Sequence, residues 1–404
     1  MSRDARATIA ALTLTLARVV ALAFIVPESA REALERRIEL SSATDSVRRA
    51  REAAYAVRAL GVSSAYDGSA YHGHPAFVYV GGTASGGVAW RAACAVAFDC
   101  VAVAFVMAMV RSRAMKDAAE ESDKVRFAAV MHLGNPLGWL SAFAGSTSSA
   151  ARAGVYASAW AATSERDVAS GCALALAAQV NPHVIAIAPV LLATSIRGRA
   201  MIGGMKFVGG FASTALASFV AMGDDFLPWW RAAVTFAVHS EDQTPNLGLH
   251  WYVFTTIYDQ FRLVYVVGFF VVPFGLSLAA TIRFPDQPLV ALVIALISIA
   301  TCAPYPTVGD IVTYTSLLPV IAADDRGNPL VYFKHGAWIV AGFLYVALLS
   351  PLTWYMWIHT RVANANFYFA ITIVHALAQT ILSNQIIMSV SKFSRSRRAD
   401  AKQD

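Results

Sequence analysis

Charged residues are scarce in this chain, at 14% of its 404 residues, whereas soluble domains average about 25%. Hydrophobic residues make up 57% of the sequence, and the mean hydropathy is +0.53. This deficit excludes an ordinary water-soluble domain, because there are too few charged side chains to cover its surface. The sequence therefore indicates a chain that lies mostly in a membrane.

Alternation of apolar and polar residues is missing from the apolar runs, for example from residues 289–303. A transmembrane β-barrel needs such alternation, so a helical fold is favoured. Many runs approach the roughly 20 residues with which a helix crosses a bilayer. We predict an all-α fold, a polytopic transmembrane helical bundle of about 12 spans, in one membrane domain over residues 1–404. The expected spans are 7–26, 88–110, 126–144, 150–163, 168–180, 183–196, 205–222, 254–282, 288–303, 308–323, 336–353 and 366–390.

Cysteine is also rare, with four residues and no C-x-x-C pair, so neither a disulfide framework nor a zinc site is expected. His72 and His74 flank Gly73, but the sequence suggests no third ligand, and we predict no metal site. The chain carries no G-x-S-x-G, phosphate-binding loop or H-E-x-x-H motif. We therefore predict no catalytic residues and no cofactor.

The first apolar run, 7–26, is interpreted as a retained signal anchor, because Pro27 and Glu28 follow it without a small-residue cleavage site. A long polar loop, 28–87, comes next. Its middle part, 31–60, has apolar residues at helical spacing and is expected to lie on the membrane surface.

The net charge of +6 reflects topology rather than nucleic-acid binding, because lysine and arginine gather in short loops and in the tail 391–404. With about twelve spans these basic loops share one side, which predicts that both termini are cytoplasmic. The loop 28–87 and most turns rich in proline, asparagine and glycine then lie on the opposite, lumenal side.

The first candidate cluster contains Asp242, Thr244 and Asn246, and precedes an aromatic run that begins at Trp251. Pro245 and Gly248 favour a turn there, and aromatic residues are typical of a membrane interface. An interfacial turn is one interpretation. The other is a polar site for a lipid headgroup beside an apolar surface for its chains.

The second cluster contains Tyr305, Thr307 and Asp310, interrupted by Pro306. An ionisable residue near a membrane boundary suggests function by default, but Asp310 could equally cap the next helix. Both interpretations remain open.

The third cluster contains Asn364, Asn366 and Phe367, after the tryptophans Trp354 and Trp357. An aromatic belt at the membrane surface explains the tryptophans. The two amides are able to donate hydrogen bonds to phosphate or sugar oxygens.

Several blocks of this sequence, in the same order, resemble the PIG-U family, a subunit of the GPI transamidase. They are 242–252 (DQTPNLGLHWY), 305–310 (YPTVGD), 317–319 (LLP), and 363–372 (ANANFYFAIT) after Trp354 and Trp357. The similarity is strongest over 239–385 and patchy before it. Two departures stand out: the segment 76–90 is glycine-rich where the family is more apolar, and the N-terminal half is unusually rich in alanine. In addition, His250 replaces an aromatic residue usual in the family.

The resemblance implies a non-catalytic, multi-span subunit of the endoplasmic reticulum membrane, with an architecture like that of GT-C glycosyltransferases. It implies a role in attaching GPI anchors to proteins, by recognising or positioning the GPI lipid. The implied partners are the protease-like catalytic subunit, the accessory subunits, the GPI lipid and the membrane, but no nucleic acid. Because the three clusters converge on one predicted side, our candidate residues for binding this lipid are Asp242, Thr244, Asn246, Trp251, Tyr305, Thr307, Asp310, Asn364, Asn366 and Phe367.

Two other functions remain to be weighed. A GT-C mannosyltransferase using dolichol-phosphate-mannose would place an acidic residue in the first lumenal loop, where Glu39, Asp45 and Asp67 stand without an Asp-x-Asp pair. A transporter would show charged residues inside the spans and an internal repeat, and neither is clear in the sequence.

Overall fold

The computed structural model describes residues 3–68, 70–81, 87–113, 118–324 and 327–400. Part of the glycine-rich segment 76–90 and the last four residues of the tail 391–404 therefore lie outside the described residues. Within the described part the chain is helical, with no strand and one isolated β-bridge between Ser46 and Ser146. The predicted all-α class is confirmed.

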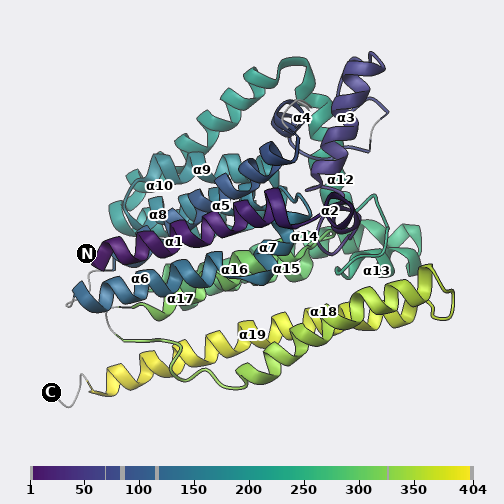
Figure 1. Ribbon diagram of the computed structural model, residues 1–404. Coiled ribbons are helices and arrows are strands. Elements are labelled where there is room, and N and C mark those ends of the chain that lie inside the picture. Colours follow the sequence, from purple (N-terminus) through teal and green to yellow (C-terminus); the bar gives the residue numbers. More distant parts are fainter. Residues whose placement is uncertain (1–2, 69, 82–86, 114–117, 325–326, 401–404) are drawn as a thin grey trace.

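Helical segments overlap each of the expected apolar stretches and are arranged in one bundle (Figure 1), although not each stretch is a single helix. The helices of the N-terminal half are α1 (Arg3–Val20, continued by a π-helical turn Ala21–Ile25), α2 (Glu28–Glu35), α3 (Val47–Ala59), α4 (Pro75–Gly81), α5 (Gly87–Arg111), α6 (Ala118–Leu133), α7 (Pro136–Phe143), α8 (Ser148–Thr163), α9 (Asp167–Val180), a 3₁₀ segment (Pro182–Ile187) and α10 (Ala188–Met222). The helices of the C-terminal half are α11 (Phe226–Trp229), α12 (Phe236–His239), α13 (His250–Thr256), α14 (Asp259–Arg283), α15 (Pro288–Cys302), α16 (Val308–Thr315), α17 (Leu318–Ala322), α18 (Gly336–Ile358) and α19 (Ala365–Asp400).

Five helical stretches in the described part are long and apolar enough to cross a membrane. They are Arg6–Ile25, Pro182–His239, Asp259–Arg283, Gly336–Ile358 and Ala365–Ala399, and shorter apolar helices are Asp167–Val180, Pro288–Cys302 and Val308–Ala322. The chain is therefore a membrane protein with several candidate spans.

The second of these stretches turns back on itself. Arg199 and Ala200 leave helical geometry, and Ala200 has a positive φ of 55°. A Cβ placed on Gly203 would lie 2.1 Å from the carbonyl oxygen of Ser195, so the two legs of α10 are in contact. These legs correspond to the separately predicted spans 183–196 and 205–222.

Small residues allow α9 and α10 to pack closely. A Cβ on Gly171 would lie 2.0 Å from the carbonyl oxygen of Phe207, and one on Gly210 would lie 2.2 Å from that of Val168. Close packing of this kind drives helix association in lipid, where burial of apolar surface gives little advantage.

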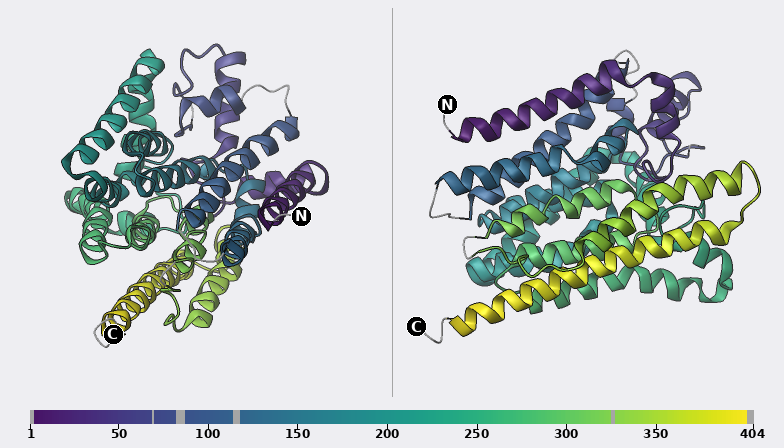
Figure 2. Two further views of the ribbon diagram at one scale, coloured as in Figure 1. Left: turned by 90° about the vertical axis from the view of Figure 1, so that its left-hand side faces the viewer. Right: turned by 60° about the horizontal axis from the view of Figure 1, so that its bottom comes forward.

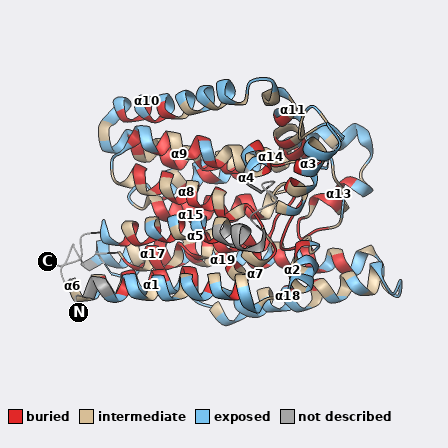
Figure 3. Cartoon of the chain, turned by 45° about the horizontal axis from the view of Figure 1, so that its top comes forward, coloured by how far each residue is buried: buried red, intermediate tan, exposed pale blue. Residues whose placement is uncertain are grey.

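The centre of the bundle is α15, whose residues from Leu289 to Ala300 are all buried. Figure 3 shows α15 as a buried helix, while α10 and α18 expose much of their length. An apolar residue on every side is expected of a helix enclosed by others. The exposed apolar residues of α10, α14 and α18 suit contact with lipid.

The helix α1 begins, and α19 ends, at the same end of the bundle (Figure 1). The opposite end carries α2, α3, α13 and the turn between α18 and α19 (Figures 1 and 2). We call the first of these the terminal end of the bundle and the second its loop end. The segment 31–60 contains two helices, α2 and α3, rather than one continuous helix.

Candidate functional site

The loop after α1 packs into the loop end of the bundle through its own backbone. The carbonyl oxygen of Glu39 accepts from the Val308 N–H at 3.0 Å, and that of Asp45 accepts from the Thr147 N–H at 2.8 Å. The Val47 N–H donates to the Gly145 carbonyl at 3.1 Å. Residues 39–47 are therefore tied to the first turn of α16 and to the turn before α8.

These contacts enclose a cavity of about 50 Å³, room for a few water molecules or one small polar group. Loop residues meet bundle residues around it. Its polar lining includes Ser42, Asp45, Arg152, Asn181, Tyr305, Thr307 and Asp310. Three of the predicted site residues thus face one space, together with an acidic residue of the first loop.

Asp45 is held firmly in this lining. One carboxylate oxygen accepts from the Ser42 N–H and hydroxyl, at 2.5 and 2.8 Å, and the other accepts from the Ser146 hydroxyl. Burial raises the pKa of Asp45 above its usual value, although these hydrogen bonds favour the charged form.

Asp310 combines the two roles that the sequence left open. Its carboxylate accepts from the Thr307 N–H at 2.9 Å, and the two residues form a reciprocal capping box at the start of α16. Asp310 also lines the cavity. Capping fixes the carboxylate at the cavity wall rather than removing it from the site.

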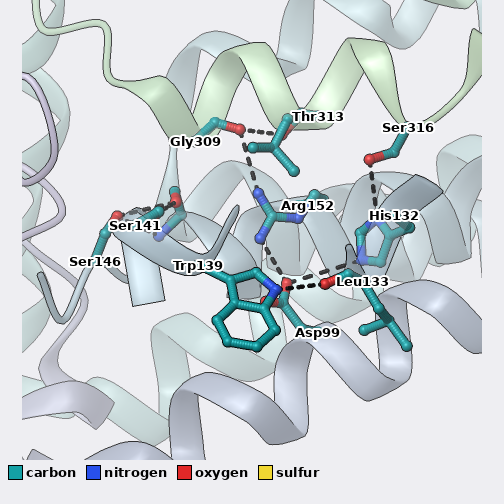
Figure 4. Close-up of polar contacts among 12 residues, drawn as sticks. Asp99, His132, Leu133, Trp139, Ser141, Ser146, Arg152, Gly309, Thr313 and Ser316 are labelled. Atoms are coloured by element: carbon teal, nitrogen blue, oxygen red, sulfur yellow. Dashed lines mark hydrogen bonds and ion pairs between the residues drawn. The ribbon is translucent and has the colours of Figure 1, made fainter. Parts of the chain in front are cut away.

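A buried cluster of charges lies behind the cavity, and the sequence interpretation missed it. Asp99 of α5 accepts from the guanidinium groups of Arg18 and Arg152, each at 2.6 Å. Arg152 also donates to the Gly309 carbonyl at 3.2 Å, as Figure 4 shows. Arg18 and Arg152 are each only 1% exposed, so this cluster fixes α1, α5, α8 and the start of α16 relative to one another.

His132 of α6 joins the same cluster. One ring nitrogen lies 2.9 Å from the Ser316 hydroxyl, and the other lies 3.9 Å from Asp99 (Figure 4). Charged residues therefore lie within the expected spans 7–26, 88–110 and 150–163, where the sequence interpretation had not recognised them. A signal was present, because Arg18 and Arg152 are each the only charged residue of their expected span and Asp99 lies in the middle of another. An intramembrane charge usually has a partner.

The segment 242–252 begins at the cavity and is folded by its own polar side chains. The Asp242 N–H donates to the Tyr305 hydroxyl at 2.9 Å, and the Asp242 carboxylate accepts from the Thr244 N–H at 2.8 Å. The Asn246 side chain accepts from the Gly248 N–H at 2.7 Å and donates to the Thr244 carbonyl at 3.1 Å. Asn246 is 1% exposed, so its amide shapes the turn.

Trp251 carries the segment onwards to the C-terminal helices. Its indole N–H donates to the Asn246 carbonyl at 3.0 Å, and its ring stacks on Trp357 with centroids 5.9 Å apart. The neighbouring Tyr252 stacks on Phe369 at 4.0 Å. These aromatic contacts seat the segment 242–252 on the loop end of α18 and α19.

The third predicted cluster lies at the turn between α18 and α19, on the outside of the molecule. Asn364 and Asn366 are exposed, and Phe367 is 59% exposed. The side-chain oxygen of Asn366 accepts from the Tyr252 hydroxyl at 2.6 Å, and that of Asn364 accepts from the Asn366 N–H at 3.0 Å. We call Tyr252, Asn364, Asn366 and Phe367 the amide platform.

Glu39 links the loop residues 39–47 to α18 and α19, the two helices that carry the amide platform. Its carboxylate accepts from the Ser350 hydroxyl of α18 at 2.8 Å and from the Tyr368 hydroxyl of α19 at 3.3 Å. All three residues are buried.

The predicted residues therefore form two groups joined by one segment. Tyr305, Thr307 and Asp310 line the cavity, and Asp242 is bonded to its rim. Asn364, Asn366 and Phe367 stand on the platform, while Thr244, Asn246 and Trp251 build the connection between the two groups. His72 and His74 do not share a partner, since His72 faces the Ala232 carbonyl and His74 faces Gln179.

Comparison with known proteins decides between the families that such a bundle could represent. The family model described as GPI transamidase subunit PIG-U matches residues 12–375 of this chain. The chain belongs to the PIG-U family. The match begins in α1 and ends in α19, so the cavity, the buried charge cluster and the amide platform all lie within it.

Individual relatives match over shorter stretches. The human "GPI-anchor transamidase component PIGU" is 32% identical over 180 residues, which cover 44% of this chain and 39% of the human protein. The "GPI transamidase component GAB1" of Saccharomyces cerevisiae is 32% identical over 140 residues, or 33% of each chain. The aligned parts thus span less than half of either relative.

Proposed function

We propose that this chain is a non-catalytic subunit of a GPI transamidase in the endoplasmic reticulum membrane, and that it positions the GPI lipid. Membership of the PIG-U family supports the role in GPI-anchor attachment, and the relatives are named as components of that transamidase. The proposed partners are the protease-like catalytic subunit, the accessory subunits and the GPI lipid.

The amide platform is the observation that carries the lipid-binding part of the proposal. Asn364 and Asn366 expose amide groups beside the exposed ring of Phe367. Amides donate to phosphate and sugar oxygens, while an aromatic ring suits the boundary between headgroups and acyl chains. A glycan-phosphate headgroup would find both kinds of contact here.

Contacts with the segment 242–252 and with the first loop fix the position of the amide platform relative to the rest of the bundle. Tyr252 and Trp251 hold it from the side of α13, and Glu39 holds α18 and α19 from the side of the first loop. A subunit that positions one substrate for a catalytic partner needs such rigidity, because misplacement of reacting groups by about 1 Å costs large factors in rate.

Subunit membership is tested by affinity purification of the tagged full chain from its native membranes, followed by mass spectrometry. We expect a protease-like subunit and further membrane subunits to co-purify in stoichiometric amounts. Recovery of the tagged chain from its native membranes without such partners would contradict the proposal.

A GT-C mannosyltransferase is the second candidate, and one observation favours it. Asp45 comes from the loop after the first span and lines the same cavity as Asp310, the place in which such an enzyme would hold an acidic residue. Incubation of the purified chain with dolichol-phosphate-mannose and a GPI precursor separates the two functions. Mannose transfer that is lost in Asp45→Asn would favour the enzyme, and absence of transfer favours the subunit.

A further inference from the structure

A second cavity lies at the terminal end of the bundle, far from the amide platform, between the end of α14 and the end of α19. Its volume is about 420 Å³, large enough for a phosphorylated headgroup. Four of its lining residues are arginines, namely Arg283, Arg395, Arg397 and Arg398. Asp286 is the single acidic residue of the lining, so the charge of this lining is four minus one, or +3.

Asp286 forms its ion pair with a residue outside this lining. The Asp286 carboxylate lies 3.3 Å from the guanidinium of Arg197, which is not part of this lining. Asp286 is thus partly neutralised from outside, and the arginines dominate the electrostatic potential inside the cavity.

Ser391 holds two of these arginines in place. The Arg283 guanidinium donates to the Ser391 hydroxyl at 3.2 Å, and the Arg395 Nε donates to the Ser391 carbonyl at 3.3 Å. A guanidinium has five N–H donors in a planar fork, so each is able to keep its contact with Ser391 and still bind an anion. The guanidinium groups of Arg283 and Arg395, both held beside Ser391, therefore form a preorganised anion site.

The position of this cavity favours a lipid over a soluble anion as its ligand. Arg283 is the last residue of one candidate membrane span, and Ser391 to Arg398 form the last turns of another. Apolar Ile282, Phe284 and Phe393 line the same cavity. Basic pockets between helix ends at a membrane surface bind anionic lipid headgroups, with the glycerol and acyl chains along the apolar side.

A third hollow provides a contrast. The groove beside α2 and α3 is of similar size, about 400 Å³, and its charged lining consists of three arginines and three glutamates. Its charges balance, and Arg48 and Arg51 form ion pairs with Glu52 and Glu35. A surplus of arginine is therefore not a general property of the hollows of this protein.

We propose that the cavity between α14 and α19 binds the phosphorylated headgroup of an anionic phospholipid from the leaflet at the terminal end of the bundle. This site is separate from the GPI lipid site proposed above, since the two lie at opposite ends of the bundle. It would anchor the end of α19 to the membrane surface.

Native mass spectrometry of the detergent-purified full chain tests this site with short-chain phosphatidylinositol 4-phosphate. We expect this lipid to bind about tenfold more tightly than short-chain phosphatidylcholine. The double variant Arg283→Gln, Arg395→Gln should weaken its binding by about tenfold, because two charge-assisted contacts are lost. The double variant Arg111→Gln, Lys124→Gln removes the same charge elsewhere at the terminal end and should bind as the wild type does.

Three results would overturn the proposal. If phosphatidylinositol 4-phosphate bound equally to the wild type and to the Arg283→Gln, Arg395→Gln variant, these arginines would not form its site. If phosphatidylcholine bound to the wild type as tightly as phosphatidylinositol 4-phosphate, the site would have no preference for anions. Equal binding of glycerophosphoinositol 4-phosphate, which lacks acyl chains, would identify a soluble phosphate as the ligand. The single variant Arg398→Gln, at an exposed position without a role in holding Ser391, repeats the test with the fold preserved and should bind about threefold more weakly.

Discussion

The Tyr252 hydroxyl donates to the side-chain oxygen of Asn366 at 2.6 Å, across 114 positions of sequence. This bond joins the segment that starts at the cavity to the first turn of α19. It fixes the direction in which Asn366 presents its NH₂ group, because the carbonyl side of the amide is occupied by the tyrosine.

We expect Tyr252→Phe to free this amide without unfolding the protein. The ring would still stack on Phe369, and loss of one hydrogen bond costs about 0.5–1.5 kcal/mol. The melting temperature should fall by a few degrees at most, while the efficiency of GPI attachment to a reporter protein should fall clearly. Tyr258→Phe, at an exposed tyrosine of the same region, is the matched control. Equal efficiency of GPI attachment in the two variants would show that the Tyr252 hydroxyl plays no part in the site.

The buried charge cluster is expected to be essential for stability. Asp99→Ala would leave the guanidinium groups of Arg18 and Arg152 buried without their shared carboxylate. Removal of one partner from a buried ion pair costs about 3–5 kcal/mol. Thermal unfolding of the purified chain should show a large decrease in melting temperature, whereas Asp224→Asn, at an exposed aspartate, should show almost none. Similar melting temperatures for the two variants would mean that the cluster contributes little.

His250 predicts how stability depends on pH. Burial lowers its pKa from 6.5 to about 3, so the folded protein keeps this ring neutral while the unfolded chain takes up a proton below pH 6.5. Its contribution to stability is therefore full above pH 6.5 and decreases as the pH falls towards 3, by about 2 kcal/mol at pH 5.

The matching variant is His250→Phe, since His250 packs against Phe269 at 4.0 Å between ring centroids. The variant should retain the packing and lose the part of the acid destabilisation that comes from this ring. At neutral pH the melting temperature of His250→Phe should equal that of the wild type. At pH 5 it should be higher than that of the wild type. His359→Phe, at an exposed histidine, should follow the wild type. Identical pH profiles for wild type and His250→Phe would contradict the assignment.

The contact between α9 and α10 depends on the absence of a side chain at Gly171. A Cβ there would lie 2.0 Å from the Phe207 carbonyl oxygen, so Gly171→Ala must separate the helices. We expect a cost of about 1–3 kcal/mol from this overpacking. Gly209→Ala is the control, because a Cβ at that position would have no atom within 4 Å and alanine favours a helix by about 1 kcal/mol. If Gly171→Ala were as stable as Gly209→Ala, the close approach would not be needed.

Most helices could be predicted from the sequence because apolar runs and helix-forming residues are local features. The break between α6 and α7 was also marked locally, since the Asn135 side chain accepts from the Leu137 N–H at 3.0 Å with Pro136 at the first helical position. The expected span 126–144 passed over this signal.

The contacts of the candidate site could not be predicted in the same way. The bond from Ser350 to Glu39 joins residues 311 positions apart, and a single sequence carries no information about such pairs. The roles of the site residues were also ambiguous from sequence, because asparagine suits both a turn and a ligand. Asn246 has its amide occupied within the turn, whereas Asn364 and Asn366 are exposed.

The central claim is that the amide platform positions the GPI lipid for the transamidase. It is tested most directly by GPI attachment to a reporter in cells that depend on this chain, with the double variant Asn364→Ala, Asn366→Ala. We expect attachment to fall by about tenfold or more, as for two lost contacts to charged groups, while the purified complex keeps all its subunits. Full attachment in the presence of an intact complex would contradict the account.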